Sequence, residues 1–257
     1  MAIAARTRDQ LALIFTMLFP MCMAWLYFVA LVTEQAQANT AVQIAFAVGK
    51  LAQGLFPALY VWWYERERLV LRHPTRDGLA WGAGFGLLVA AAIVGLYLFW
   101  FKTSPLLGNT PQKILHKLQE SGMASPGAYL GMAVFYCVLH SLFEEYYWRW
   151  FVFGTMRRHM PVAVANVLSS LGFMLHHVVI LGMFFPGRFW TLALPFSLGV
   201  AVGGAVWAWI YQRTGSLYAA WLSHALIDAA LMAVGYDMVA PYFQPVLFDG
   251  LQMTPAE

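Results

Sequence analysis

Long runs of apolar residues, broken by short polar connections, extend along almost the whole chain. A membrane-spanning helix requires about 20 predominantly apolar residues. The pattern therefore predicts seven spans, at residues 11–32, 41–64, 79–101, 128–156, 161–184, 189–211 and 216–236. The C-terminal stretch that remains is a candidate for an eighth, poorly formed membrane segment or for a surface segment. With no long soluble stretch and no clear internal repeat, we expect a single all-α integral-membrane domain over residues 1–257, a polytopic transmembrane helix bundle of seven to eight segments.

The segment NTPQKILHKLQESG, between the third and fourth spans, has apolar residues on one side of a helix and charged residues on the other. Ile114, Leu115 and Leu118 form the apolar side. Thr110 is the expected N-cap and Pro111 the first helical residue. We predict a short helix lying in the membrane interface, either as a plain amphipathic connector or with a gating role.

The composition supports a membrane protein and argues against other classes. Hydrophobic residues make up 61% of the 257 residues and charged residues only 11%, whereas a soluble domain usually carries about 25% charged residues. The net charge of +3 is too small to indicate a nucleic-acid partner, and no basic run with interleaved aromatic residues is present. Cys22 and Cys137 have neither metal-type nor disulfide-type spacing, so we interpret them as small apolar core residues.

The distribution of Lys and Arg predicts the orientation in the membrane. With the N-terminus in the cytoplasm, the cytoplasmic segments hold nine such residues, namely Arg6, Arg8, Arg66, Arg68, Arg72, Arg76, Arg157, Arg158 and Arg213. The opposite segments hold four, namely Lys102, Lys113, Lys117 and Arg188. We therefore expect a multi-pass protein of the cell membrane with a cytoplasmic N-terminus. The first apolar run is long enough to span and has no small-residue cleavage site, so we expect a membrane helix there and not a removed signal peptide.

Several ionisable residues fall inside the predicted spans, where each charge is costly and usually marks a site or a pathway. They are Lys50, His140, Glu144, Glu145, Arg149, His176, His177, His224 and Asp228. Residues four apart share a helix face, so Glu145 and Arg149 can form an ion pair. Glu144 is rotated by about 100° from Glu145 and shares its face with His140. The fourth span is thus predicted to carry one paired carboxylate and one freer carboxylate.

Two further spans each present a polar face. Phe173 and His177 are four residues apart, as are His224 and Asp228. At a rise of about 1.5 Å per residue, these positions are compatible with one site near the middle of the bilayer together with Glu144. Taken singly, an intramembrane histidine or a Glu–Arg pair is as well explained by contacts between helices. Taken together, these side chains are the groups needed to activate a water molecule.

The three patterns resemble the motifs of a known family. Glu144-Glu145-xxx-Arg149, Phe173-xxx-His177 and His224-xxx-Asp228 match EExxxR, FxxxH and HxxxN/D, in that order on three predicted membrane helices. These are the motifs of the CAAX-protease and bacteriocin-processing (CPBP/Abi) family of glutamate-type intramembrane proteases. The resemblance covers the motif-bearing core at 128–236 and implies an α-helical membrane bundle.

The resemblance also implies residue roles. Glu144 would be the catalytic base, with His177 as its partner in activating water. His224 and Asp228 would stabilise the oxyanion, although an ionised Asp228 cannot donate a hydrogen bond and would then orient His224 or the water. Glu145, Arg149 and Phe173 would support the site.

The implied reaction is hydrolysis of a peptide bond near the C-terminus or membrane anchor of a protein. The expected partners are a membrane-anchored or C-terminally tagged protein or peptide substrate and the lipid bilayer, with no nucleic acid, and we expect a bacterial inner membrane as the location. No cofactor is expected, and zinc held by the carboxylates and histidines, Glu144, His177, His224 and Asp228, is the less favoured alternative. Two other functions stay open. These are a proton-coupled transporter or channel, and a non-catalytic membrane binding or immunity protein.

Overall fold

The computed structural model describes residues 2–30, 39–66 and 72–243, with side chains from residue 6 onwards. Within these ranges the chain is all-helical and contains no strand. Seven helices are long and apolar enough to cross a membrane, and each overlaps one predicted span. They are Arg6–Ala30, Thr40–Glu65, Arg76–Thr103, Pro126–Met156, Val162–Phe184, Phe189–Thr214 and Leu217–Tyr242. The prediction of a polytopic helical membrane protein is confirmed.

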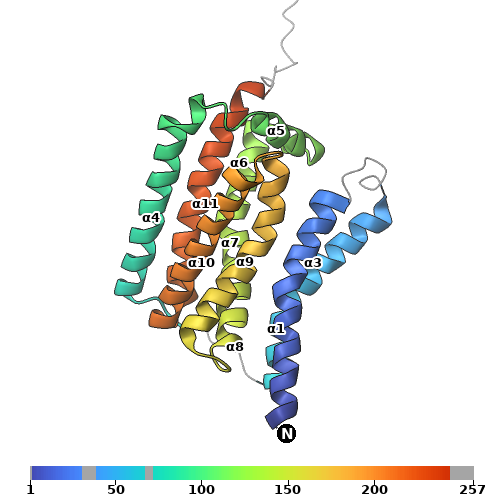
Figure 1. The fold of residues 1–257 in the computed structure, drawn as a ribbon, viewed down its shortest axis with the longest axis vertical. Coiled ribbons are helices and arrows are strands. Elements are labelled where there is room, and N and C mark those ends of the chain that lie inside the picture. The colour runs from blue at the N-terminus through green and yellow to red at the C-terminus, as the bar shows by residue number, and fades with distance from the viewer. Residues whose placement is uncertain (1, 31–38, 67–71, 244–257) are drawn as a thin grey trace, which may run out of the picture.

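The spans run up and down in sequence order (Figure 1). The first three are built from α1 (Ala2–Trp25) with η1 (Leu26–Ala30), α3 (Thr40–Tyr60) with η2 (Val61–Glu65), and α4 (Arg76–Phe99) with η3 (Phe101–Thr103). The fourth is α6 (Pro126–Val134), η4 (Phe135–His140), α7 (Ser141–Glu145), η5 (Tyr146–Phe153) and α8 (Gly154–Met156). The last three are α9 (Val162–Phe184), η6 (Phe189–Ala193) with α10 (Leu194–Thr214), and α11 (Leu217–Val239) with η7 (Ala240–Tyr242). The predicted eighth segment lies largely outside the described residues.

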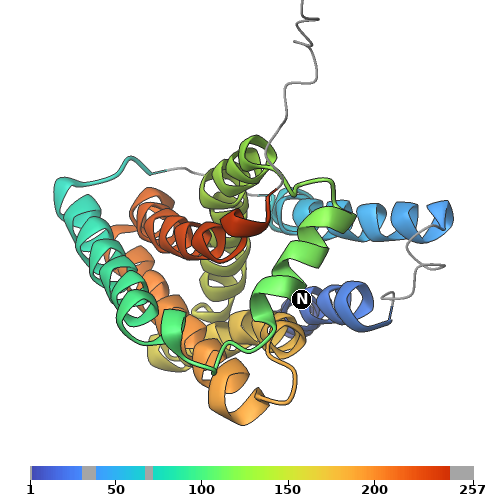
Figure 2. The same ribbon diagram turned by 90° about the horizontal axis from the view of Figure 1, so that it is seen from above.

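Helix α11 occupies the centre of the C-terminal bundle, next to α4, α10 and the helix α6–α8 (Figure 2). The backbones of α4 and α11 approach closely because α4 has glycines where they touch. A Cβ on Gly82 would clash with the carbonyl oxygen of Ala219, and one on Gly86 would lie 2.9 Å from that of Ser223. Small residues favour such packing in a membrane, because apolar side chains gain little by exchanging contacts with lipid tails for contacts with another helix. The contact fixes the part of α11 that precedes His224.

The N-terminal helices α1 and α3 lie to one side of this bundle and are joined to it near the N-terminal end (Figures 1 and 2). The buried Asp9 carboxylate makes the connection. It accepts a hydrogen bond from Tyr60 on α3 at 2.5 Å and lies 2.9 Å from Nε2 of His159, in the turn before α9. Arg8 adds an ion pair to Asp9 at 3.1 Å. Three separate parts of the chain are therefore tied together by one carboxylate.

The interfacial helix is present as α5 (Thr110–Glu120), but its N-cap is Asn109 and not Thr110. The one-residue error has a tertiary cause, because the Thr110 hydroxyl donates to the carbonyl of Phe184 at the end of α9. The apolar face packs on the protein itself, with Leu118 buried against Tyr129 on α6 and Val239 on α11. Helix α5 thus lies across the end of the bundle, on the helices that follow it.

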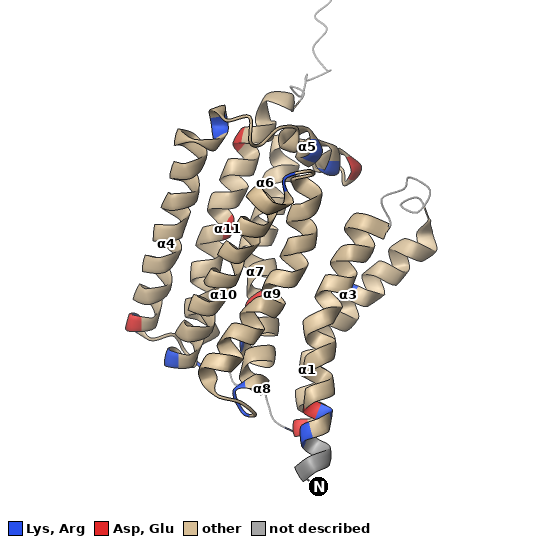
Figure 3. Cartoon of the chain, in the orientation of Figure 1, with Lys and Arg blue, Asp and Glu red and all other residues tan. Residues whose placement is uncertain are grey.

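Charged residues gather at the two ends of the molecule and are sparse between them (Figure 3). Exposed aromatic residues mark the same two levels. Those near the N-terminal end are Trp62, Trp63 and Trp81, and those near the other end are Phe99, Trp100 and Trp190. Aromatic belts of this kind sit at the two faces of a membrane. The chain is therefore a multi-pass membrane protein, and its orientation stays a prediction.

Candidate active site

Glu144 and Glu145 lie near the middle of the fourth span, on the short α-helical turn α7. This turn is flanked by two π-helical stretches, η4 before it and η5 after it. π-Helical turns are rare and occur often at functional sites, where the wider turn redirects side chains. The two carboxylates point into the protein, since Glu144 is 8% exposed and Glu145 is fully buried.

Glu145 faces a cation. Its Oε1 atom lies 3.0 Å from Nη1 of Arg149, which is itself buried. The Nη1 hydrogens do not point along this line, so the contact is an ion pair without a hydrogen bond. The same Oε1 atom is 2.8 Å from Nδ1 of His224, which donates to it if the carboxylate is ionised. The predicted Glu145–Arg149 pair is confirmed.

Two aromatic rings enclose the Arg149 guanidinium. Its central carbon lies 4.6 Å from the centre of the Phe173 ring on α9 and 4.8 Å from that of Trp207 on α10. A cation removed from water gains from such faces, and arginine is suited to them because its group is planar. Phe173 therefore contacts the cation that is paired with Glu145.

Glu144 faces imidazoles. Its Oε1 atom lies 3.3 Å from Nε2 of His176 and 3.4 Å from Nε2 of His140. Its Oε2 atom lies 3.6 Å from Nε2 of His224. The first is within hydrogen-bond distance, and the last is too long for a direct bond but short enough for a bridging atom. Glu144 is therefore surrounded by groups that can exchange protons, and among the described residues no Lys or Arg forms an ion-pair contact with it.

His177 and Asp228 complete the cluster. The Nδ1 atom of His177 lies 3.1 Å from the carbonyl oxygen of Phe173, to which it donates, so the other ring nitrogen stays available. The rings of His176 and His177 are 4.1 Å apart. Asp228 Oδ1 lies 3.7 Å from Nε2 of His224, as their shared helix face predicts. The three motif-bearing helices thus bring their polar residues to one place.

The comparison with known families supports the same part of the chain. Residues 126–230 match the family model for type II CAAX prenyl endopeptidases, described as Rce1-like. Residues 126–230 form an Rce1-like domain. No curated protein and no solved structure matches the chain at a significant level. The match runs from the start of α6 into α11 and contains all three motifs, so the predicted family is confirmed for this core.

The site of the Rce1-like domain contains residues that spacing alone did not single out. His176 and His140 were interpreted as possible helix contacts, yet both lie nearer to the Glu144 carboxylate than a bridging water would require. Trp207, whose ring is 4.1 Å from that of His224, belongs to none of the three motifs. The sequence offered only two indications of these contacts. His140 precedes Glu144 by four residues, and His176 is adjacent to His177. Lys50 on α3 lies 3.5 Å from the side-chain oxygen of Gln53 and interacts electrostatically with Glu144.

A metal ion is chemically compatible with part of the Rce1-like site. One ligand atom each from Glu144, His176 and His177 lies within 4.8 Å of the others. Two imidazole nitrogens and one carboxylate oxygen are a known catalytic zinc set, and the His176 Nδ1 atom is buried without a hydrogen-bond partner among the described residues. This set differs from the one predicted, because His176 replaces His224 and Asp228. If zinc were bound, it would polarise a water or a carbonyl oxygen.

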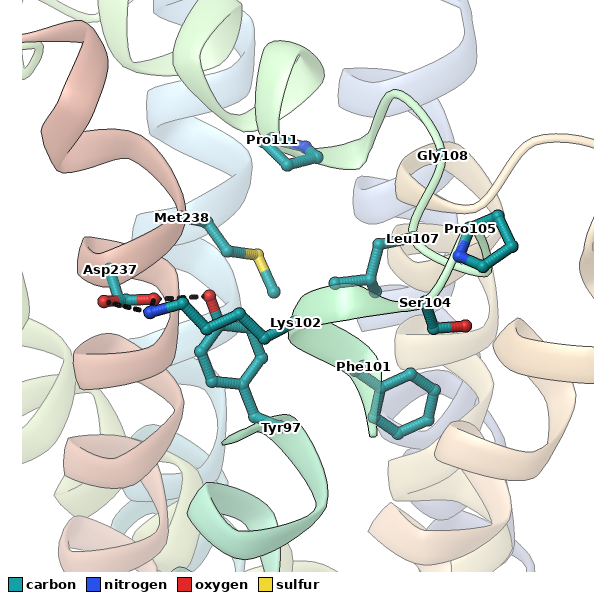
Figure 4. A pocket seen from close by; sticks show the side chains of 10 residues that line it. All are labelled: Tyr97, Phe101, Lys102, Ser104, Pro105, Leu107, Gly108, Pro111, Asp237 and Met238. Atoms are coloured by element: carbon teal, nitrogen blue, oxygen red, sulfur yellow. Dashed lines mark hydrogen bonds and ion pairs between the residues drawn. The ribbon is translucent and has the colours of Figure 1, made fainter. Parts of the chain in front are cut away.

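The described part of the chain also has a pocket of about 380 Å³, whose lining residues are shown in Figure 4. It lies between the end of α4, η3, the start of α5 and the end of α11, at the end of the molecule opposite the N-terminus (Figure 1). Its polar groups are already paired, since Lys102 lies 2.7 Å from Oδ2 of Asp237 and the Tyr97 hydroxyl donates to the same oxygen at 2.6 Å. The rest of the lining is mainly apolar. This pocket lies between η3 and the end of α11, and the carboxylate that lines it, Asp237, is already paired with Lys102 and Tyr97.

Proposed function

We propose that the chain is an intramembrane endopeptidase that cleaves a peptide bond near the C-terminus or membrane anchor of a protein substrate. The observation that carries the proposal is the difference between two adjacent carboxylates. Glu145 is neutralised by Arg149, whereas Glu144 lies among the nitrogens of His140, His176 and His224. A carboxylate held in this way near the middle of a span can act as a general base.

In the proposed reaction, a water molecule between Glu144 and the free nitrogen of His177 attacks the scissile carbonyl carbon. Glu144 takes one proton from this water, and the carbonyl oxygen becomes an oxyanion. The C–N bond then breaks, and the proton held by Glu144 passes to the leaving nitrogen. The products are a carboxylate-terminated chain and an amine-terminated peptide.

His224 is placed to stabilise the oxyanion. Its Nδ1 is engaged by Glu145 at 2.8 Å, and its Nε2 lies 3.6 Å from Glu144 and 3.7 Å from Asp228. These two separations leave room for a reacting atom within reach of Nε2. In its charged form the imidazole carries a proton on Nε2 and can donate it to the oxyanion. Asp228 would favour that charged form and orient the ring.

The family description, which names CAAX prenyl endopeptidases, supports the proposed substrate class. We propose a membrane-anchored or C-terminally tagged protein as substrate, in a bacterial inner membrane with the N-terminus in the cytoplasm. We also propose that the reaction needs no metal, because Glu144 is more useful as a base than as a ligand.

The experiment compares the membrane proteomes of cells that express the wild type or Glu144→Ala, by mass spectrometry of protein N- and C-termini. New termini present only with the wild type would support the protease and identify its substrate. Glu120→Ala, an exposed glutamate on α5, is the matched control and should leave the termini unchanged. Identical termini in all three strains, with equal expression, would contradict the proposal and favour a transporter or a binding protein.

A further inference from the structure

Trp207 lies outside the three motifs and yet contacts the site directly. It belongs to α10 and is 4% exposed. Its ring stacks on the imidazole of His224, with centres 4.1 Å apart and planes inclined by 16°. No other ring in the described part of the chain lies so close and so nearly parallel to an imidazole of this site.

The indole is itself held in place. Its Nε1 atom donates a hydrogen bond of 3.0 Å to the hydroxyl of Ser223, the residue before His224. Ser223 is fully buried and lies where α4 approaches α11, since Gly86 faces its backbone. The Trp207 ring and the His224 backbone are thus connected through one side chain, so they keep their relative position when either helix moves slightly.

The imidazole of His224 requires such a support. Within the described residues its side chain makes one hydrogen bond, from Nδ1 to Glu145, and its Nε2 is beyond bonding distance from Glu144 and Asp228. One hydrogen bond tolerates a departure of about 30° from linearity, so the contact at Nδ1 limits the rotation of the ring about its Cβ–Cγ bond without removing it. A flat surface against the ring removes this rotation, and offset-stacked aromatic rings favour that arrangement. Glu145 therefore sets the position of the ring, and the indole sets its plane.

We propose that Trp207 is a positioning residue that aims Nε2 of His224 at the reacting atoms. The effect of Trp207 on catalysis rests on the proposed function. Its effect on the orientation of the His224 ring does not depend on that function. A displacement of about 1 Å in a catalytic group can reduce the rate by about 100-fold. A flat ring at position 207 should therefore be required for turnover, and an aliphatic side chain of similar bulk should not replace it.

The chain provides matched controls. Trp209 is on the same helix, 37% exposed, and packs edge-on against Trp81 outside the site. Trp148 is buried and lies parallel to the other site histidine, His176, with ring centres 6.0 Å apart and planes inclined by 8°. The same Trp→Leu substitution at three positions thus separates an effect on His224 from a general effect on packing.

The first measurement does not depend on activity. The full-length protein in detergent is treated with diethyl pyrocarbonate, and modification of each histidine is followed by mass spectrometry. We expect His224 to be protected in the wild type and in Trp207→Phe, and to lose protection in Trp207→Leu while His176 keeps it. Trp148→Leu should show the reverse, and Trp209→Leu should change neither. Equal exposure of both histidines in Trp207→Leu and Trp148→Leu, or a protected His224 in Trp207→Leu, would overturn the proposal.

The second measurement uses an internally quenched, farnesylated peptide with a CAAX-type end. We expect Trp207→Leu to lower kcat by about 100-fold with KM unchanged, and Trp207→Phe to lose at most about tenfold, because it lacks only one neutral hydrogen bond. Equal losses in the two variants, or a change in KM alone, would contradict a positioning role. If the wild type leaves this peptide intact, the proposed substrate is wrong, and the modification experiment still decides whether Trp207 holds His224.

Discussion

Glu144 and Glu145 are neighbours in the chain, but they lie in two different environments. Glu145 is fully buried, contacts the Arg149 guanidinium and accepts a bond from His224. Glu144 retains 8% exposure and faces the nitrogens of His140 and His176. A rotation of about 100° along one helix therefore separates a carboxylate paired with arginine from one surrounded by imidazoles.

The difference shows how a membrane helix can carry two acids next to each other. A buried charge is tolerated when a partner neutralises it, because the ion pair offsets part of the cost of removing the two groups from water. An acid whose neighbours are imidazoles is less firmly neutralised, and its proton can be exchanged. The same turn of helix thus combines a fixed anchor with a group suited to chemistry, and each can be removed separately.

Replacement of the reactive acid should have the largest effect on activity. In Glu144→Gln the shape is kept but the base is lost, and general-base catalysis contributes about 10²–10⁴-fold. We expect at least that loss in kcat, with little change in thermal stability, since no strong cation is left unpaired. Purified variants are compared by peptide cleavage and by thermal unfolding in detergent. A Glu144→Gln protein that cleaves at the wild-type rate would show that Glu144 is not the base.

Removal of the structural cation should instead affect folding. Arg149→Ala leaves the buried Glu145 without its partner, which typically costs about 3–5 kcal/mol. We expect a low yield and a reduced unfolding temperature. A double variant, Glu145→Leu with Arg149→Leu, should recover most of the stability because the buried charge is gone. It should stay inactive because His224 has lost the oxygen that its Nδ1 contacts. Normal stability in Arg149→Ala would contradict the role of the ion pair.

Much of this arrangement could be predicted from the sequence because it depends on local rules. Span lengths follow from the thickness of the bilayer, and all seven are present. The Glu145–Arg149 pair follows from the spacing of four residues, which brings side chains together on any helix. The separation of the two acids onto different faces follows from the same geometry.

The remaining features depend on contacts between helices, which spacing does not determine. Nothing local predicts the π-helical stretches beside α7, nor the stacking of Trp207 on His224. The N-cap of α5 was predicted one residue too late, at Thr110, because the Thr110 hydroxyl bonds to the distant carbonyl of Phe184. Helix periodicity also cannot decide which of two adjacent histidines, His176 or His177, faces a given neighbour.

The two histidines of α9 provide a finer test of the comparison. His176 contacts Glu144 directly at 3.3 Å, whereas His177 is anchored to the Phe173 carbonyl and keeps one nitrogen available. We expect His177→Ala to lose about 10²-fold or more in kcat, as a partner in proton transfer. His176→Ala should lose about tenfold, because it supports the carboxylate without contacting the water. The reverse order of kcat losses, measured on the same peptide, would assign the water to His176.

Removal of metal should have the smallest effect. If Glu144 acts as a base, the protein dialysed against a chelator should retain its full rate, and added zinc should not raise it. Zinc bound by Glu144, His176 and His177 would engage the carboxylate of Glu144 as a ligand and reduce its basicity. The cleavage rate and the metal content of the same sample are measured together. If the rate falls when the metal is removed and recovers when zinc is added, Glu144 would be a metal ligand and not the base. The different environments of Glu144 and the Arg149-paired Glu145 would remain.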